Sequence, residues 1–231
     1  MFIPRRNLKK GNKGFTLVEL LVTITIFVML TAVVLWNQAK FNSTILLTNL
    51  AYDTALTIRQ AQTYGINIKS FTANGDTDFV PYGVHFETTA GNDKSFILFA
   101  DRDNVFDEAT QTYRKLGDGK FDGRADTCLS DYDDDPEGLV DGCVNRYNIK
   151  RGNKIYALCA EDVLDGETEC SSLATKLNKL DIVFKRPNPD AIITSGNNTI
   201  TSTVTIILSG VEGDTFRKIK VGQNGLISIA K

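Results

Sequence analysis

The first feature of the hydrophobic pattern is a long apolar run close to the N-terminus. From Phe15 to Trp36 the chain has 22 residues with one charge, Glu19. A helix rises about 1.5 Å per residue, so this run is long enough to cross a bilayer core of about 30 Å. A carboxylate is costly in hydrocarbon, and acids inside membrane spans usually have a functional partner. The pattern therefore predicts a transmembrane helix over 15–36 that carries one functional acid.

A helical period continues beyond this span. Apolar and small residues recur at offsets of three and four, which places them on one face of an amphipathic helix. The residues on this face are Leu47, Leu50, Ala51, Thr54, Ile58 and Ala61. We expect a single helix from Phe15 to about Tyr64, roughly 75 Å long at 1.5 Å per residue, with Gly65 as its stop signal. Its second half, 37–65, is expected to pack against a head domain.

After Gly65, short apolar or alternating runs separated by Gly, Asn and Asp indicate an antiparallel sheet. The expected strands are Val80–Glu87, Ser95–Ala100, Lys154–Cys159, Leu180–Lys185, Thr203–Leu208, Phe216–Val221 and Leu226–Ala230. The turn signal Asn224-Gly225 predicts a hairpin between the last two strands. The pattern therefore predicts an α+β fold, in which the long N-terminal helix packs on a β-rich head over 66–231.

Charge is distributed unevenly along the chain. Residues 1–14 hold five of the 26 Lys and Arg and no acid, so the rest of the chain has 21 bases against 28 acids, a balance of −7. The positive-inside preference places the basic segment in the cytoplasm and the head outside, on a single-pass protein of the cytoplasmic (inner) membrane. A cleavable secretory signal fits poorly because the small residue Gly14 precedes the apolar run, and an uncleaved anchor is the plain alternative. No dense basic surface is left, so nucleic acid is not expected as a partner.

The segment from Lys13 to Val22, KGFTLVELLV, resembles the prepilin processing motif of type IV pilins and type II secretion pseudopilins. The resemblance implies that prepilin peptidase removes residues 1–14 by cleaving after Gly14, and methylates the new amino group of Phe15. It also implies that Glu19 corresponds to the family's intramembrane glutamate. A buried carboxylate needs a cation or donor, and the freed amino terminus of a neighbouring subunit is a suitable one. Phe15 and Glu19 are therefore the expected assembly residues.

The rest of the chain resembles one branch of the family more loosely, the minor pseudopilins of the GspH/FimT type. The matching segments are 49–62, 82–86, 96–101 and 219–227. Two features depart from the family. Trp36 stands where many major pilins have a helix-kinking proline, and an acidic insertion over about 101–175 has no counterpart.

This insertion raises the possibility of a calcium site. Between Asp118 and Asp141 it has nine acids against two bases, and carboxylates near glycine turns are typical calcium ligands. The spacing of Asp131, Asp133 and Asp135, followed by Glu137, resembles the start of an EF-hand loop, but Gly142 stands where the bidentate acid belongs. A second partial pattern comprises Asp101, Asp103 and Asp107. Two interpretations stay open: a solvated acidic loop without a cofactor, or a site for Ca²⁺.

Four cysteines lie in or beside the insertion, namely Cys128, Cys143, Cys159 and Cys170. An even number in an exported domain indicates two disulfides, for which three connectivities are possible. Proximity along the chain favours Cys128 with Cys143 and Cys159 with Cys170.

A catalytic function finds little support in the sequence. His85 is the only histidine, it lies in an alternating run, and no Gly-x-Ser-x-Gly elbow or Walker-type glycine loop accompanies it. A half-buried position in a sheet explains His85 better than catalysis does. The recurring aromatics Phe79, Tyr82, Phe86, Phe96 and Phe99 are expected to be core residues. We therefore expect no enzyme.

The sequence favours a structural minor pilin or pseudopilin. Its expected partners are other pilin subunits, prepilin peptidase and the membrane, and its expected destination is a pilus or pseudopilus at the cell surface or in the periplasm. The alternative is a membrane-anchored, calcium-dependent adhesin that does not polymerise, and an anchored hydrolase ranks third.

Overall fold

The computed structural model describes residues 14–67, 69–73, 76–102, 104–107, 112–115, 117–123, 142–161, 169–170, 175–211 and 213–230. Within helices and strands, the side chains of 36–41, 72–78, 104–107 and 112–115 are not described. The chain forms two compact units, Met1–Asn42 and Ser43–Lys231, which we describe separately. One helix, α1 (Leu17–Ile66, 50 residues), contributes to both units.

The first unit contains the predicted membrane span. Residues Leu17–Leu35 form a helical segment long and apolar enough to cross a membrane, and none of its surface is buried inside the protein. Its threonine hydroxyls donate to backbone carbonyls one turn earlier, as Thr23 does to Leu20 at 2.9 Å and Thr31 to Phe27 at 2.7 Å. Polar side chains in this segment therefore satisfy their donors within the helix itself, as a helix in hydrocarbon requires.

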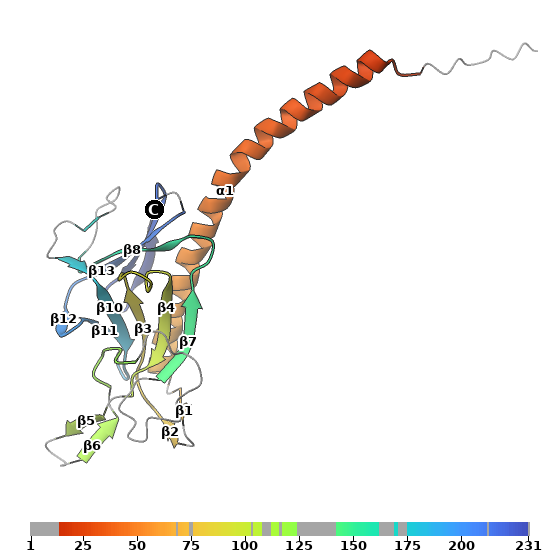
Figure 1. Cartoon of the computed structure of the whole chain (residues 1–231). Coiled ribbons are helices and arrows are strands. Elements are labelled where there is room, and N and C mark those ends of the chain that lie inside the picture. The colour runs from red at the N-terminus through yellow and green to blue at the C-terminus, as the bar shows by residue number, and fades with distance from the viewer. Residues whose placement is uncertain are drawn as a thin grey trace, which may run out of the picture. The chain divides into compact units, whose positions relative to one another are not determined.

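The second unit contains two antiparallel sheets (Figure 1). The six-stranded sheet has the order β12-β11-β10-β3-β4-β7, and the five-stranded sheet has the order β15-β14-β13-β8-β9. The strands of the first sheet are β3 (Tyr82–Glu87), β4 (Ser95–Ala100), β7 (Gly142–Asn148), β10 (Lys179–Phe184), β11 (Ala191–Ser195) and β12 (Asn198–Ile200). Those of the second are β8 (Lys154–Cys159), β9 (Lys176–Leu177), β13 (Val204–Ser209), β14 (Phe216–Val221) and β15 (Ile227–Ala230). Two small hairpins, β1 (Phe71–Ala73) with β2 (Asp76–Asp78) and β5 (Asn104–Asp107) with β6 (Thr112–Lys115), complete the described strands.

The core lies between the second half of α1 and the inner faces of both sheets (Figure 1). The predicted helix face is confirmed, because five of its six residues belong to this core or pack against it and the sixth, Thr54, is fully buried. Burial of these side chains, at about 1.5 to 3 kcal/mol for each large one, supplies the main driving force for docking the helix on the sheets.

The predicted α+β fold is confirmed, and each of the seven predicted strands coincides with an observed one to within two residues. The strands β7, β11 and β12 were not predicted. β7 lies inside the 101–175 range and pairs with β4, so this range contributes a strand to the main sheet as well as β8 to the second one.

Two predictions about aromatic and glycine residues are wrong in detail. Tyr82, Phe86, Phe96 and Phe99 are buried as expected, but Phe79 is 54% exposed. Phe79 precedes β3, and the guanidinium carbon of Arg186 lies 5.8 Å from the centroid of the Phe79 ring. The helix also continues one residue past Gly65, to Ile66. A Cβ on Gly65 would lie 2.2 Å from the carbonyl oxygen of Phe184, so this glycine is required for close packing of the helix on β10 and does not itself end the helix.

Candidate functional site

The segment with the expected processing and assembly residues has a well-defined helix start. The amide of Glu19 donates to the hydroxyl of Thr16 at 3.2 Å, and the amide of Leu20 donates to the Thr16 carbonyl at 3.1 Å. Thr16 is therefore the N-cap, which explains why the helix begins at Leu17, two residues later than predicted. The spacing from Thr16 to Glu19 is that of a capping box, with the acid in the first turn.

Gly14 and Phe15 precede this cap and are both exposed. Gly14 has open space where a Cβ would be, and the Phe15 side chain is 76% exposed. A protease that cuts between them needs an accessible segment outside the helix, and these two residues provide one. Most of the predicted leader, residues 1–13, lies outside the described residues.

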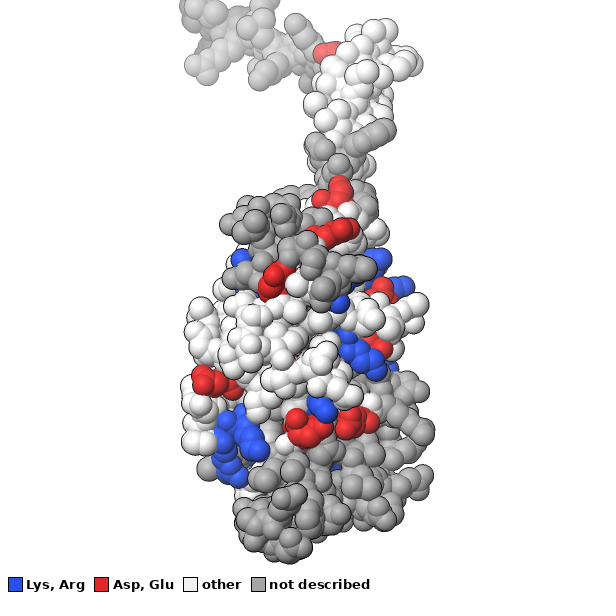
Figure 2. Space-filling view, turned by 90° about the vertical axis from the view of Figure 1, so that its left-hand side faces the viewer, with Lys and Arg blue, Asp and Glu red and all other residues white. Residues whose placement is uncertain are grey.

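Glu19 is also exposed, on a helix surface that is otherwise apolar. It is the only acidic or basic residue between Phe15 and Leu35, and the helical segment is correspondingly uncharged apart from one acidic side chain (Figure 2). Its large neighbours are exposed as well, for example Leu17 at 76% and Val18 at 69%. Such an extended apolar surface needs lipid or other helices to cover it, and Glu19 then needs a cation within that covering.

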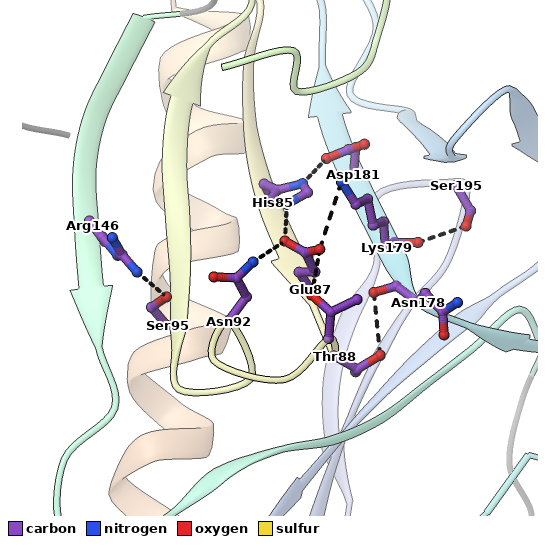
Figure 3. A network of polar contacts seen from close by, with 11 residues as sticks. His85, Glu87, Thr88, Asn92, Ser95, Arg146, Asn178, Lys179, Asp181 and Ser195 are labelled. Carbon is purple, nitrogen blue, oxygen red and sulfur yellow. Dashed lines mark hydrogen bonds and ion pairs between the residues drawn. The ribbon is translucent and has the colours of Figure 1, made fainter. Parts of the chain in front are cut away.

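A second group of polar residues lies in the head, on the outer face of the six-stranded sheet (Figure 3). His85 Nδ1 lies 2.5 Å from a carboxylate oxygen of Asp181 on the neighbouring strand β10. Its Nε2 lies 4.0 Å from Glu87, which also accepts hydrogen bonds from Thr89 at 2.6 Å and Asn92 at 2.7 Å. His85 is buried, with 4% of its surface exposed, so the expectation of a half-buried residue is wrong.

The charged groups of this network each have a polar or oppositely charged partner within it. Burial works to raise the pKa of Glu87, but the hydrogen bonds from Thr89 and Asn92 and the charge of Lys179, 3.7 Å away, outweigh it, so the pKa lies below its ordinary value. The ring of Phe121 covers the His85 ring at a centroid distance of 4.8 Å. A substrate would have to displace Phe121 to reach His85, and the network is better explained as a stabilising feature of the sheet.

Phe121 belongs to a strap, which we define as residues 117–123, that crosses this outer face. Gly83 leaves space for the Phe99 ring, which in turn packs on Phe121 at a centroid distance of 5.1 Å. The hydroxyl of Thr194 on β11 donates to the carbonyl of Gly119 at 2.7 Å. The sheet is therefore covered on both faces, by α1 on one and by the strap on the other.

The carboxylate of Asp101 fixes the start of the strap. Its carboxylate is buried and accepts hydrogen bonds from the amides of Asp118 at 3.1 Å and Gly119 at 2.9 Å. Burial raises the pKa of Asp101 to about 7, with a further contribution from the charge of Asp118 and an opposing one from the two amides. The sequence pattern missed this function because the partners are 17 and 18 residues away.

The other proposed calcium ligands are not tested by these contacts. Asp103, Asp131, Asp133, Asp135 and Glu137 lie outside the described residues, and Asp107 is described in its backbone alone. Among the residues that are described, no group of three or more His, Cys, Asp or Glu could hold a metal ion.

One of the two predicted disulfides is present in the described chain. Cys159 and Cys170 form a disulfide with a Cα–Cα distance of 5.4 Å, next to a small apolar cluster on the outer face of the second sheet. Cys143 is also disulfide-bonded, and Cys128, its predicted partner, lies outside the described residues.

Comparison with known proteins bears on the N-terminal segment alone. Residues 9–35 match the prokaryotic N-terminal methylation motif. No curated protein and no solved structure matches the chain. The match indicates a type IV pilin-like prepilin signal over these residues, and with the apolar helix it is consistent with anchorage in the inner membrane.

Proposed function

We propose that this protein is a structural minor pilin or pseudopilin of the GspH/FimT type and not an enzyme. Prepilin peptidase cleaves it after Gly14, and its helix then packs into a type IV pilus or a secretion pseudopilus. The observation that carries this proposal is the placement of Glu19. It lies in the capped first turn of a fully exposed apolar helix, inside the methylation motif.

Assembly follows from the chemistry of this turn. Cleavage leaves a methylated ammonium at Phe15, next to the positive end of its own helix dipole, where a cation is unfavourable. A neighbouring Glu19 carboxylate neutralises that ammonium and is neutralised in return. Phe15 and Glu19 are four residues apart, so this pair offsets neighbouring helices by about one turn, roughly 6 Å along the axis.

The first measurement is the intact mass and N-terminal sequence of the protein recovered from its host membranes without reductant. A methylated Phe15 at the N-terminus is expected, together with a mass for fully paired cysteines. An N-terminus at Met1, in cells with active peptidase, would refute processing and make the anchored adhesin the better interpretation.

Polymerisation is tested separately with Glu19→Leu and Glu19→Ala, compared with Thr23→Ala in the same helix as a control. Both Glu19 variants are expected to insert in the membrane and to be missing from sheared filaments, whereas the control is incorporated. Normal incorporation of the Glu19 variants would contradict the assigned function of this acid.

A further inference from the structure

Three turns of the head lie together at the end of the sheets from which α1 continues towards its N-terminus (Figure 1). They are the β3–β4 turn (88–94), the β7–β8 turn (149–153) and the β13–β14 turn (210–215). The amide of Ile149 donates to the carbonyl of Lys94, and that of Ile155 to the carbonyl of Asp93, both at 2.8 Å. A Cβ placed on Gly152 would lie 3.1 Å from Cγ2 of Val211, so Gly152 packs closely against Val211. We call this surface the proximal end of the head.

The direction of the strands confirms which end this is. β3 begins at Tyr82, whose ring contacts Tyr64 near the end of α1 at a centroid distance of 5.4 Å. It runs from there to Glu87, and the 88–94 turn follows. The proximal end is therefore remote from Ile66 and close to the part of α1 that begins the head at Ser43.

Four basic residues gather at the proximal end: Lys94, Lys150, Arg151 and Lys154. All four side chains are exposed, and none forms an ion pair with a described carboxylate. Val211 lies among them and is 58% exposed, although it is apolar. The same turns contain three acids by sequence, Asp93, Glu212 and Asp214, of which Glu212 lies outside the described residues. Exposed cations around an apolar side chain are typical of surfaces that bind the interface of an anionic bilayer.

The length of chain between the span and the head supplies the second argument. The span ends at Leu35 and the head begins at Ser43. Eight residue steps reach at most about 28 Å even when fully extended, so Ser43, where the head begins, stays within that distance of the end of the span. The processed chain has a balance of −7 charges, and an anionic surface therefore repels most of the molecule and attracts this end.

We propose that the proximal end of the head docks on anionic phospholipid headgroups of the membrane that holds the helix, before the subunit enters a filament. This inference rests on the membrane anchorage in the proposed function but not on processing or polymerisation. Each uncompensated basic residue near an anionic surface multiplies the docked population about fivefold, and four bases against three acids leave one such residue at the proximal end. Docking holds the head in one orientation and so presents the helix to the assembly machinery in a fixed rotation.

The test uses the full chain in nanodiscs of phosphatidylcholine, with and without phosphatidylglycerol, and follows hydrogen–deuterium exchange in the three turns. Exchange at 88–94, 149–153 and 210–215 is expected to slow several-fold with the anionic lipid and to recover at high salt. The variant Lys94→Gln/Lys150→Gln/Arg151→Gln/Lys154→Gln is expected to abolish this protection. Because the four side chains are exposed and unpaired with described acids, its melting temperature is expected to equal that of the wild type.

A matched control removes three bases from the opposite end of the head, Lys69, Lys185 and Arg186, each changed to Gln, and is compared with the proximal triple variant Lys94→Gln/Lys150→Gln/Arg151→Gln. It makes the same change in net charge and is expected to keep the protection. Equal protection in both lipids, or protection that survives in the proximal variant, would overturn the proposal. Protection that appears only when other pilin subunits are added would also overturn it and would identify an acidic protein surface as the partner. Processing at Phe15 is measured independently, so failure of either proposal is recognised on its own.

Discussion

The contact between the end of α1 and strand β10 leads to a sharp prediction for Gly65→Ala. The new Cβ would lie 2.2 Å from the carbonyl oxygen and 2.9 Å from the carbonyl carbon of Phe184. An ordinary contact is about 3.4 Å, so the helix and the strand must separate by roughly 1 Å. Phe184 pairs with both Tyr82 and Ala191, and this double pairing prevents its carbonyl from moving aside.

The expected change in the free energy of unfolding follows from two opposing effects. Overpacking of a rigid core costs up to about 3 kcal/mol, whereas Ala in place of Gly in a helix gains about 1 kcal/mol. The expected net loss in the free energy of unfolding is therefore about 2 kcal/mol, which for a head of this size lowers the melting temperature by about 4 to 8 °C.

The assay is urea unfolding of the full chain in detergent, followed by circular dichroism of the strands. Thr63→Ala, at an exposed position one half-turn earlier in α1, is the control, and its effect is expected to stay within about 0.5 kcal/mol. A Gly65→Ala head that is as stable as the wild type, or more stable, would refute the close seating of the helix on Phe184.

Two further predictions concern a disulfide and a buried carboxylate of the head. Cys159 and Cys170 are 11 residues apart, so Cys159→Ala/Cys170→Ala should lower the free energy of unfolding by about 3 kcal/mol, the loop-entropy value for such a separation; a loss under about 1 kcal/mol in urea titrations would contradict it. The pKa of Asp101 is about 7 in the fold and 3.8 as a free side chain. The unfolded chain therefore loses this proton at lower pH than the folded one does, and Asp101 makes the head less stable as the pH rises from about 4 to 7, by at most about 4 kcal/mol. In Asp101→Asn this slope should be smaller than in the wild type, and identical slopes would show that the group does not titrate in this range.

Much of the fold could be predicted because strands such as β4 and β13 are short apolar runs bounded by turn residues, and α1 has a continuous helical period. β11 and β12 were missed although a signal existed. Ser195 pairs with Asn198 around Gly196-Asn197, and a Gly-Asn pair between two strands is a known hairpin signal. β7 had no comparable signal, because this edge strand alternates only weakly and six of its seven residues are partly buried or exposed without a clear period.

The contacts on the outer face of the sheet were beyond sequence reasoning for a different reason. The His85–Asp181 pair joins residues 96 apart in the chain. The Asp101 carboxylate accepts hydrogen bonds from strap amides 17 and 18 residues away. Such pairs are set by the register between strands, which depends on every strand in the sheet. The N-terminal motif is the opposite case, since it could be read from one short segment of the sequence.

Two explanations compete for Glu19: it stabilises the capped start of α1, or it pairs with the amino terminus of a neighbouring subunit. Their energies differ. An acid in the first turn of a helix gains about 0.3 to 1 kcal/mol from the helix dipole, but placing it in a membrane span costs up to about 2.5 to 3.5 kcal/mol. Thr16 already accepts the hydrogen bond from the Glu19 amide, so helix capping does not require this carboxylate, and a cation from a neighbour is needed to offset the cost. Glu19→Gln separates the explanations because it keeps the size and hydrogen bonding of a capping-box residue and removes the charge. If Glu19 pairs with a neighbouring amino terminus, Glu19→Gln should fall below the wild type in sheared filaments at equal membrane levels; equal incorporation would assign the residue to capping alone.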